Sequence, residues 1–386
     1  MPRSDKNSSA SALAGVGGRD ELVPRPTASG KVGPSGGRGG TSFLGVVRCS
    51  AAVVGTLLVL LVGAEAGLRM IRLVRPPRAV LDPKFGWRLN EYITRRYSAR
   101  RADGQPYEVS YHTTRDGFRF WGEPPGGRFS LLVVGDSYTE AYQVSDLRTW
   151  YWRLRERLGP EWRLYAYGCG GYGMLQEYLL LREYLEEIDP TLVIWQWCAN
   201  DLWNDSPFLD SRTIKSFNVY PRPYLTAQGS VALGFPHGGA LLAQHSALWL
   251  WLLPRAVRKL RLQPSRYDVY DFSLRPIREG FDRLGVIAGM ASRFLAHRRV
   301  VVFNVGGVPE FNRRLALIAR RSGFEWIGGL NEHLQRLREQ GVVVDAHPSV
   351  GGHWCERGHE EVAEFLYRKL AGRLQGLTAV APVVND

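Results

Sequence analysis

From about residue 129 onward, short apolar runs alternate with longer amphipathic segments. The apolar runs have the length and β-branched content of buried strands, and the amphipathic segments repeat apolar residues at helical spacing. Strands separated by helices form parallel sheets with helices on both faces. We therefore expect a doubly wound α/β domain over residues 129–386. The expected strands are Ser130–Val134, Arg163–Tyr167, Thr191–Trp197, Val300–Val305 and Gly341–Val344, and the expected helices are Trp150–Leu158, Leu175–Ile188, Gly280–Ala296, Asn312–Ser322, Leu330–Gln340 and Glu360–Leu374.

The N-terminal third has a different pattern. Residues 1–42 are rich in Gly, Ser, Ala and Pro and predict a disordered segment. Residues 43–68 include the uncharged run Cys49–Ala64 and predict a transmembrane anchor. Residues 69–128 then form a linker and N-terminal extension, and residues 202–270 form an irregular insertion in the α/β domain, too long for an ordinary connection.

The charge and the cysteine content limit which classes of partner and which covalent or metal links we expect. The 386-residue chain has a formal net charge of +13, but its arginines are dispersed, which does not favour nucleic-acid binding. Anionic membrane lipid or an acidic glycan suits this charge equally well. The four cysteines, Cys49, Cys169, Cys198 and Cys355, form neither a disulfide framework nor a zinc-type pair. Buried thiols are the favoured interpretation, and one bridge between Cys169 and Cys198 is left open.

The most informative position is the end of the first expected strand. There the run Leu131–Val134 passes into Gly135, Asp136 and Ser137. A helix starting just after Ser137 would point its backbone N–H groups at the serine hydroxyl and at any oxyanion formed there. Ser137 is therefore the candidate nucleophile. The alternative is that Asp136 or Ser137 only caps the helix.

Other expected strands end in complementary chemical groups. The second strand is followed by Gly171, the third by Asn200 and Asp201, and the last by Asp345 and His353. Active sites of doubly wound sheets form at these carboxyl ends. A hydroxyl, an imidazole, a carboxylate and N–H donors together suit acyl transfer from an ester, which requires no cofactor and no metal.

These blocks resemble those of the SGNH or GDSL hydrolase family. Gly135-Asp136-Ser137 is similar to its nucleophile block, Gly171 to its oxyanion glycine, Asn200-Asp201 to its Asn block, and His353 with Gly358–Ala363 to its histidine block. Thr114–Arg119 also resembles a Gly-Phe-Arg element of membrane-anchored bacterial members. The resemblance implies a flavodoxin-like three-layer fold, with Ser137, His353 and Asp345 catalytic and with Ser137, Gly171 and Asn200 forming the oxyanion hole.

Two positions depart from this family pattern. Cys198 stands where a glycine usually precedes the Asn, and Val350 and Gly351 stand where the catalytic Asp usually precedes the His. A second register, starting at Asp345, would make His347 the base. The helix expected over Glu360–Leu374 fits the His353 register better, and Asp345 is the nearest upstream carboxylate in both.

Two other functions remain as alternatives. The spacing Gly168-x-Gly170-x-x-Gly173 also satisfies a dinucleotide-binding pattern, with Asp201 as a ribose ligand. A catalytically inactive module that keeps the fold is the second. The dinucleotide interpretation leaves the Ser, Asn and His blocks unexplained, whereas the inactive module would be one that has lost the catalytic acid.

We therefore expect a single-pass membrane protein that cleaves an O-acyl ester of a small molecule or a glycan, such as a carbohydrate O-acetyl group. Transfer of the acyl group to a sugar hydroxyl instead of water is left open. The arginines that follow the anchor, Arg69, Arg72, Arg75 and Arg78, would by a strict count keep the domain cytoplasmic. The family resemblance implies an extracytoplasmic domain, which is the location we expect.

Overall fold

The computed structural model describes residues 43–74, 76–211, 220–234, 245–260, 270–348 and 352–378. Its central feature is a six-stranded sheet with the order β12-β11-β8-β6-β7-β5. All neighbouring strands are parallel except β5, which pairs antiparallel with β7 at one edge. The strands are β5 (Phe120–Glu123), β6 (Phe129–Gly135), β7 (Trp162–Gly168), β8 (Leu192–Cys198), β11 (Arg299–Val305) and β12 (Glu325–Ile327).

The five parallel strands have the flavodoxin-like order. In chain order β6 is first, β7 lies on one side of it and β8 on the other, and β11 and β12 continue beyond β8. The chain direction across the sheet therefore reverses at β6, which makes the carboxyl end of β6 the topological switch point. This confirms the expected doubly wound fold.

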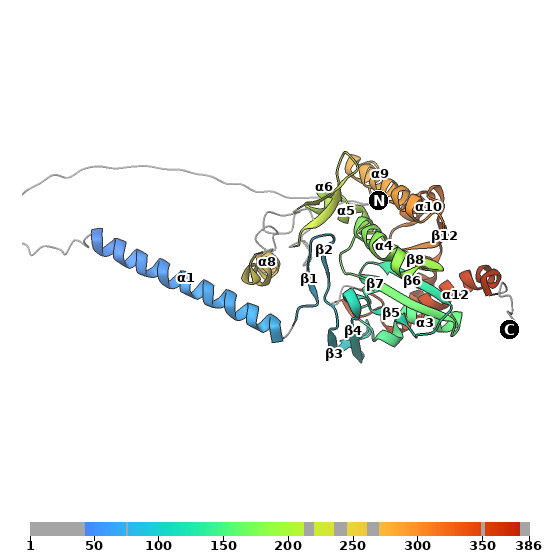
Figure 1. The fold of residues 1–386 in the computed structure, drawn as a ribbon, viewed down its shortest axis with the longest axis horizontal. Coiled ribbons are helices and arrows are strands. Elements are labelled where there is room, and N and C mark those ends of the chain that lie inside the picture. Colours follow the sequence, from blue (N-terminus) through green and yellow to red (C-terminus); the bar gives the residue numbers. More distant parts are fainter. Residues whose placement is uncertain are drawn as a thin grey trace, which may run out of the picture. The chain divides into compact units, whose positions relative to one another are not determined.

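Helices cover both faces of the sheet, as Figure 1 shows. The first face packs against α4, α9 and α10, and the second against α3, α11 and α12. The bounds are α3 (Trp150–Leu158), α4 (Met174–Ile188), α9 (Arg275–Phe294), α10 (Pro309–Arg321), α11 (Leu330–Glu339) and α12 (Glu356–Thr378). All six lie where the apolar periodicity predicts helices.

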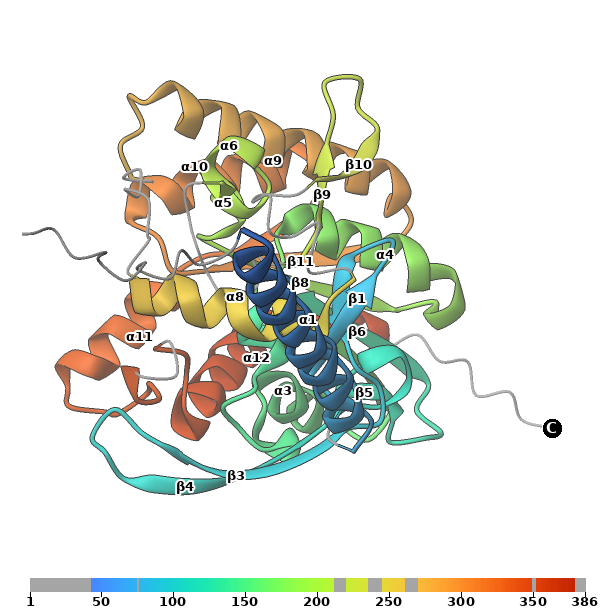
Figure 2. The same cartoon turned by 90° about the vertical axis from the view of Figure 1, so that its left-hand side faces the viewer.

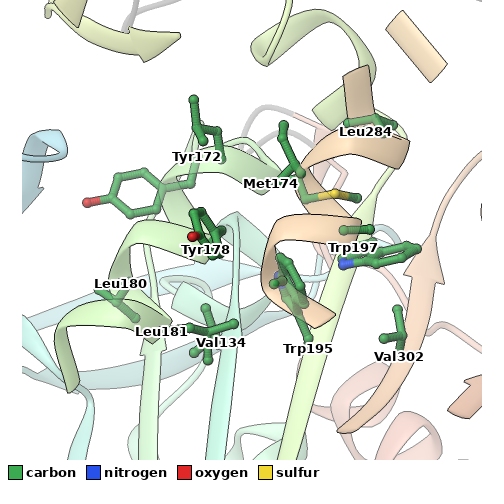
Figure 3. Packing of buried hydrophobic residues seen from close by; sticks show 14 of the residues in the cluster. Val134, Tyr172, Met174, Tyr178, Leu180, Leu181, Trp195, Trp197, Leu284 and Val302 are labelled. Atoms are coloured by element: carbon green, nitrogen blue, oxygen red, sulfur yellow. The ribbon is translucent and has the colours of Figure 1, made fainter. Parts of the chain in front are cut away.

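Each buried strand contributes to two cores because its side chains alternate between the faces. In β6, Leu132 and Val134 belong to the first core, whereas Leu131 and Val133 belong to the second. Figure 3 shows the first core, in which strand residues such as Val134 and Trp197 share one cluster with Leu181 of α4 and Leu284 of α9. Since every residue of β6 is buried, this strand is held firmly on both faces.

One expected strand is wrong. The segment Gly341–Val344 does not join the sheet, and the edge position is occupied by the three-residue strand β12. Residues Asp345 and Ala346 instead form isolated bridges with Trp354 and Arg101. Such a short, partly polar edge strand has too few residues to show alternation, whereas the Val-rich run after α11 imitates a strand.

Smaller elements surround the sheet. The N-terminal extension folds into two antiparallel hairpins and supplies β5, so the sheet includes residues before the expected boundary at 129. The described parts of the 202–270 insertion contain short helices and a third hairpin. The bounds are β1 (Ala79–Asp82), β2 (Gly86–Leu89), β3 (Thr94–Arg100), β4 (Pro106–His112), α2 (Ser137–Glu140), α5 (Asp201–Asn204), α6 (Pro207–Asp210), β9 (Arg222–Leu225), β10 (Val231–Gly234) and α8 (Ala247–Leu260), with the 3-10 turns η1 (Arg115–Gly117) and η2 (Asp146–Arg148).

Helix α1 (Phe43–Val74) covers the expected anchor. Its segment Gly45–Val74 has a mean hydropathy of 2.2 in its most apolar window and is not buried by other parts of the structure. By length and composition this helix is able to cross a membrane. The segment expected to be disordered, 1–42, lies outside the described residues.

Candidate active site

Ser137 lies at the sharp turn between β6 and α2. Asp136 caps α2, since its Oδ1 accepts the backbone N–H of Tyr138 at 3.0 Å. The turn packs closely against β7, because a Cβ on Gly168 would lie 2.1 Å from the backbone nitrogen of Glu140. The capping role therefore falls to Asp136. The Ser137 hydroxyl lies 3.4 Å from Asp136 Oδ2 and has a second, closer partner.

That partner is His353, which lies in the loop before α12. Its Nε2 lies 2.7 Å from Ser137 Oγ. The imidazole also lies against the Tyr138 ring, with centroids 4.7 Å apart. With the ring proton on Nδ1, Nε2 accepts the hydroxyl proton, which is the arrangement that activates a serine.

Three donors at the neighbouring strand ends have no acceptor within the described part of the chain. They are the backbone N–H groups of Ser137 and Gly171 and the side-chain amide of Asn200. Ser137, Gly171 and Asn200 follow β6, β7 and β8, which are adjacent and parallel. Gly171 has a φ of +84°, so a larger residue would be strained at this turn. Hydrogen-bond donors without an acceptor at the carboxyl ends of adjacent strands are able to stabilise an oxyanion.

The predicted acid has a different partner. Both carboxylate oxygens of Asp345 accept from Arg338, at 2.6 Å from Nε and 2.9 Å from Nη2. Asp345 pairs with Trp354 in a backbone bridge, which keeps its backbone beside the His353 loop. The backbone N–H of His347 donates to the carbonyl of Arg100 at 2.8 Å. Of the two candidate histidines, His353 is therefore the one whose ring meets Ser137.

Two supporting residues were not assigned roles from the sequence. The buried Glu140 carboxylate accepts the N–H of Gly170 at 2.6 Å and pairs with Arg78 at 2.7 Å. The buried Arg119 donates to the Ala141 carbonyl at 3.2 Å and to Asp146. The Glu140 contact connects the turn after Ser137 to the loop that contains Gly171, and the Arg119 contacts connect the same turn to η2. The Gly-Phe-Arg element was a signal for Arg119, whereas no pattern indicates Glu140.

Burial shifts the pKa values of acids and thiols near this site upward. Burial raises the pKa of Asp201 and Glu177 well above the usual range, and nearby carboxylates add to the shift. Burial likewise raises the pKa of the Cys169 and Cys198 thiols. All four cysteines are free, so the Cys169–Cys198 bridge is not formed. A raised pKa lowers the thiolate fraction and with it the nucleophilicity of Cys169 and Cys198.

Part of the glycine loop that matches the dinucleotide-binding pattern is already bonded within the protein. The Gly170 N–H is already bonded to Glu140, and Asn204 donates to the carbonyls of Gly171 and Tyr172. Asp201, the candidate ribose ligand, is 1% exposed, and its carboxylate accepts the N–H of Cys198 at 2.9 Å. The Gly170 N–H and one oxygen of the Asp201 carboxylate are therefore already bonded within the protein, whereas the Gly171 N–H has no acceptor among the described residues.

No family model and no curated protein matches the chain. Among solved structures, it is similar to LAE5, an α/β hydrolase from the metagenome of Lake Arreo in Spain, with 12% identity, a TM-score of 0.37 and coverage of 64% of this chain and 96% of that one. It is also similar to TesA, with 15% identity, a TM-score of 0.37 and coverage of 63% and 98%. For the acetylxylan esterase Axe2 from Geobacillus stearothermophilus, the values are 12%, 0.34, 64% and 95%. Similarity at this level carries no functional argument.

Proposed function

We propose that this protein is a membrane-anchored serine esterase of the SGNH type that cleaves an O-acyl ester. The observation that supports it most is the 2.7 Å contact between Ser137 Oγ and His353 Nε2 at the topological switch point of the sheet. A general base within hydrogen-bond reach is the geometric requirement for a serine nucleophile.

In the proposed reaction, Ser137 Oγ attacks the ester carbonyl carbon while His353 accepts the hydroxyl proton. The carbonyl π electrons move to oxygen, and the N–H groups of Ser137, Gly171 and Asn200 stabilise the resulting oxyanion. Each such donor contributes about 2.7–4 kcal/mol to lowering a barrier of this kind. The tetrahedral intermediate then expels the alcohol, which takes the proton from His353, and water attacks the acyl-enzyme by the same route in reverse.

Asp345 remains our candidate for the carboxylate that orients His353. Its backbone position beside the His353 loop supports this role, whereas its ion pair with Arg338 competes with it. A carboxylate at this place would stabilise the imidazolium that forms as Ser137 attacks.

Covalent labelling tests the nucleophile. A fluorophosphonate probe should label the full-length protein, with the Ser137 oxygen replacing fluoride on phosphorus. Ser137→Ala and His353→Gln should abolish labelling and p-nitrophenyl acetate hydrolysis, while the matched control His347→Gln should retain both. Absence of labelling in the folded wild type would favour the inactive module, and saturable nicotinamide dinucleotide binding would favour the dinucleotide alternative. Either result would refute the esterase.

The proposed substrate is an O-acyl group on a carbohydrate of the cell envelope, and the proposed location of the domain is extracytoplasmic. Incubation with an acyl donor and a sugar acceptor, followed by mass spectrometry, separates hydrolysis from transfer, because only transfer yields an acylated sugar. Protease digestion of intact spheroplasts tests the location. Protection of the α/β domain in these cells would contradict it.

A further inference from the structure

Helix α8 (Ala247–Leu260) is joined to α1 by a carboxylate. Glu65 of α1 accepts the backbone N–H groups of Ala247 and Leu248 and the hydroxyl of Ser246, each at 2.9 Å. Arg69, one turn further along α1, donates to the carbonyl of His245 at 2.9 Å. The first turn of α8 is thus capped by α1, and both helices can be followed in Figure 2.

This attachment lies where α1 changes from apolar to charged. The run from Gly45 to Ala64, in which Arg48 is the single charged residue, matches one crossing of a bilayer, since about 20 helical residues span a hydrocarbon core of ~30 Å. If α1 crosses the membrane over this run, as the proposed anchor requires, Glu65 and Arg69 lie at the boundary between lipid and water. The start of α8 then lies at the same depth.

The exposed side chains of α8 suit that boundary. Trp251 and Leu252 are 43% and 42% exposed, although both are large and apolar. The Arg255 guanidinium stacks 4.3 Å from the centre of the Trp251 ring. Tryptophan is enriched at membrane interfaces, and an arginine there covers apolar surface with its stem while its charge reaches lipid phosphates. The sequence continues with Arg258 and Lys259 in the same helix.

We propose that α8 is an interfacial helix that lies on the bilayer beside α1, with Trp251 and Leu252 inserted among the lipids and Arg255 at the anionic headgroups. The α/β domain is then held to the membrane at two places. This inference rests on the membrane anchor of the proposed function but not on the esterase chemistry. It makes the bilayer, and not a second protein copy, the partner of the exposed α8 surface.

Spin labels on the full-length protein test this placement. In a Cys49→Ser background, single Leu252→Cys and Leu317→Cys variants are labelled with a nitroxide and reconstituted, one chain per nanodisc, in phosphatidylcholine and phosphatidylglycerol. Leu317 on α10 is a matched control because it is an apolar residue with 46% exposure. A label at 252 should be more accessible to oxygen and less accessible to a water-soluble nickel chelate than the label at 317.

A third label, at Val59→Cys in α1, distinguishes failure of the interfacial helix from failure of the membrane anchor. If the label at 59 lies in lipid but the label at 252 matches that at 317, the interfacial helix is refuted and the anchor stands. If the label at 59 is also aqueous, the anchor itself fails, and the inference fails with it. Dipolar broadening at 252 in samples with two chains per nanodisc, together with protection from both reagents, would assign the surface to a protein contact and overturn the proposal.

Discussion

Because His359 is buried, we predict that the folded protein loses stability in mild acid. Its Nδ1 accepts the backbone N–H of Trp150, the first residue of α3, at 3.1 Å. Burial, and after it the charges of Arg119 and His353, lower the pKa of His359 from 6.5 to about 3. Protonation would remove the acceptor and place a positive charge at the N-terminus of α3, where the helix dipole is unfavourable to cations.

The direction and the size of the stability change follow from the lowered pKa of His359. Below pH 6.5 the unfolded chain binds a proton at this position that the folded protein does not, so stability falls as the pH is lowered towards 3. One pKa unit corresponds to 1.36 kcal/mol, which makes the loss about 2 kcal/mol at pH 5 and about 4 kcal/mol at pH 3. Above pH 6.5 this histidine contributes no pH dependence.

His359→Asn isolates the effect, since the asparagine oxygen can accept the same N–H group without titrating. The variant should be less stable than the wild type at pH 7.5, because the imidazole packs edge-on against Trp354 with ring centroids 5.6 Å apart. Its stability should nevertheless change less between pH 6.5 and 5 than that of the wild type. Urea unfolding of the full-length protein in mild detergent, followed by tryptophan fluorescence, measures both.

His297→Asn is the control, because His297 is exposed. Its replacement should leave the dependence of the free energy of unfolding on pH as it is in the wild type. If the free energy of unfolding changes with pH equally in the wild type and in His359→Asn, the reasoning is refuted. An NMR titration in which the imidazole of His359 gains its proton near pH 6.5 would refute it as well.

Two further predictions concern the site. Gly168→Ala should destabilise the protein by about 3 kcal/mol or more and abolish fluorophosphonate labelling, because its Cβ would overlap the backbone of α2. Gly289→Ala in α9, whose Cβ meets nothing within 4 Å, should be neutral or stabilising, and equal effects of both changes in thermal unfolding would contradict the packing argument. Asp345→Asn should lower the kcat of ester hydrolysis by up to about 10⁴-fold if Asp345 orients His353, whereas Arg338→Gln, which removes only the ion pair, should leave kcat within severalfold. Similar kcat values for Asp345→Asn and wild type would remove Asp345 from the mechanism.

The sequence by itself determined the layered architecture and indicated one pair of side chains that meet in the structure. Periodicity reports which side chains are buried, so it located the four strands whose apolar runs are long, β6, β7, β8 and β11. It missed the short strands β5 and β12. Chemical groups at strand ends indicated Ser137 and His353, and their side chains do meet.

Tertiary structure decided what depends on contacts between distant segments. The local sequence pattern could not show that Asp345 pairs with Arg338. Nor could it show that Glu140 bonds to the loop beside Gly171, or that Glu65 caps α8. Each of these is a polar contact whose partner is set by how the chain packs, not by its own neighbours in sequence. Apolar periodicity reports only that a residue is buried, whereas the direction of a buried or capping carboxylate follows from which donors the completed fold brings within reach.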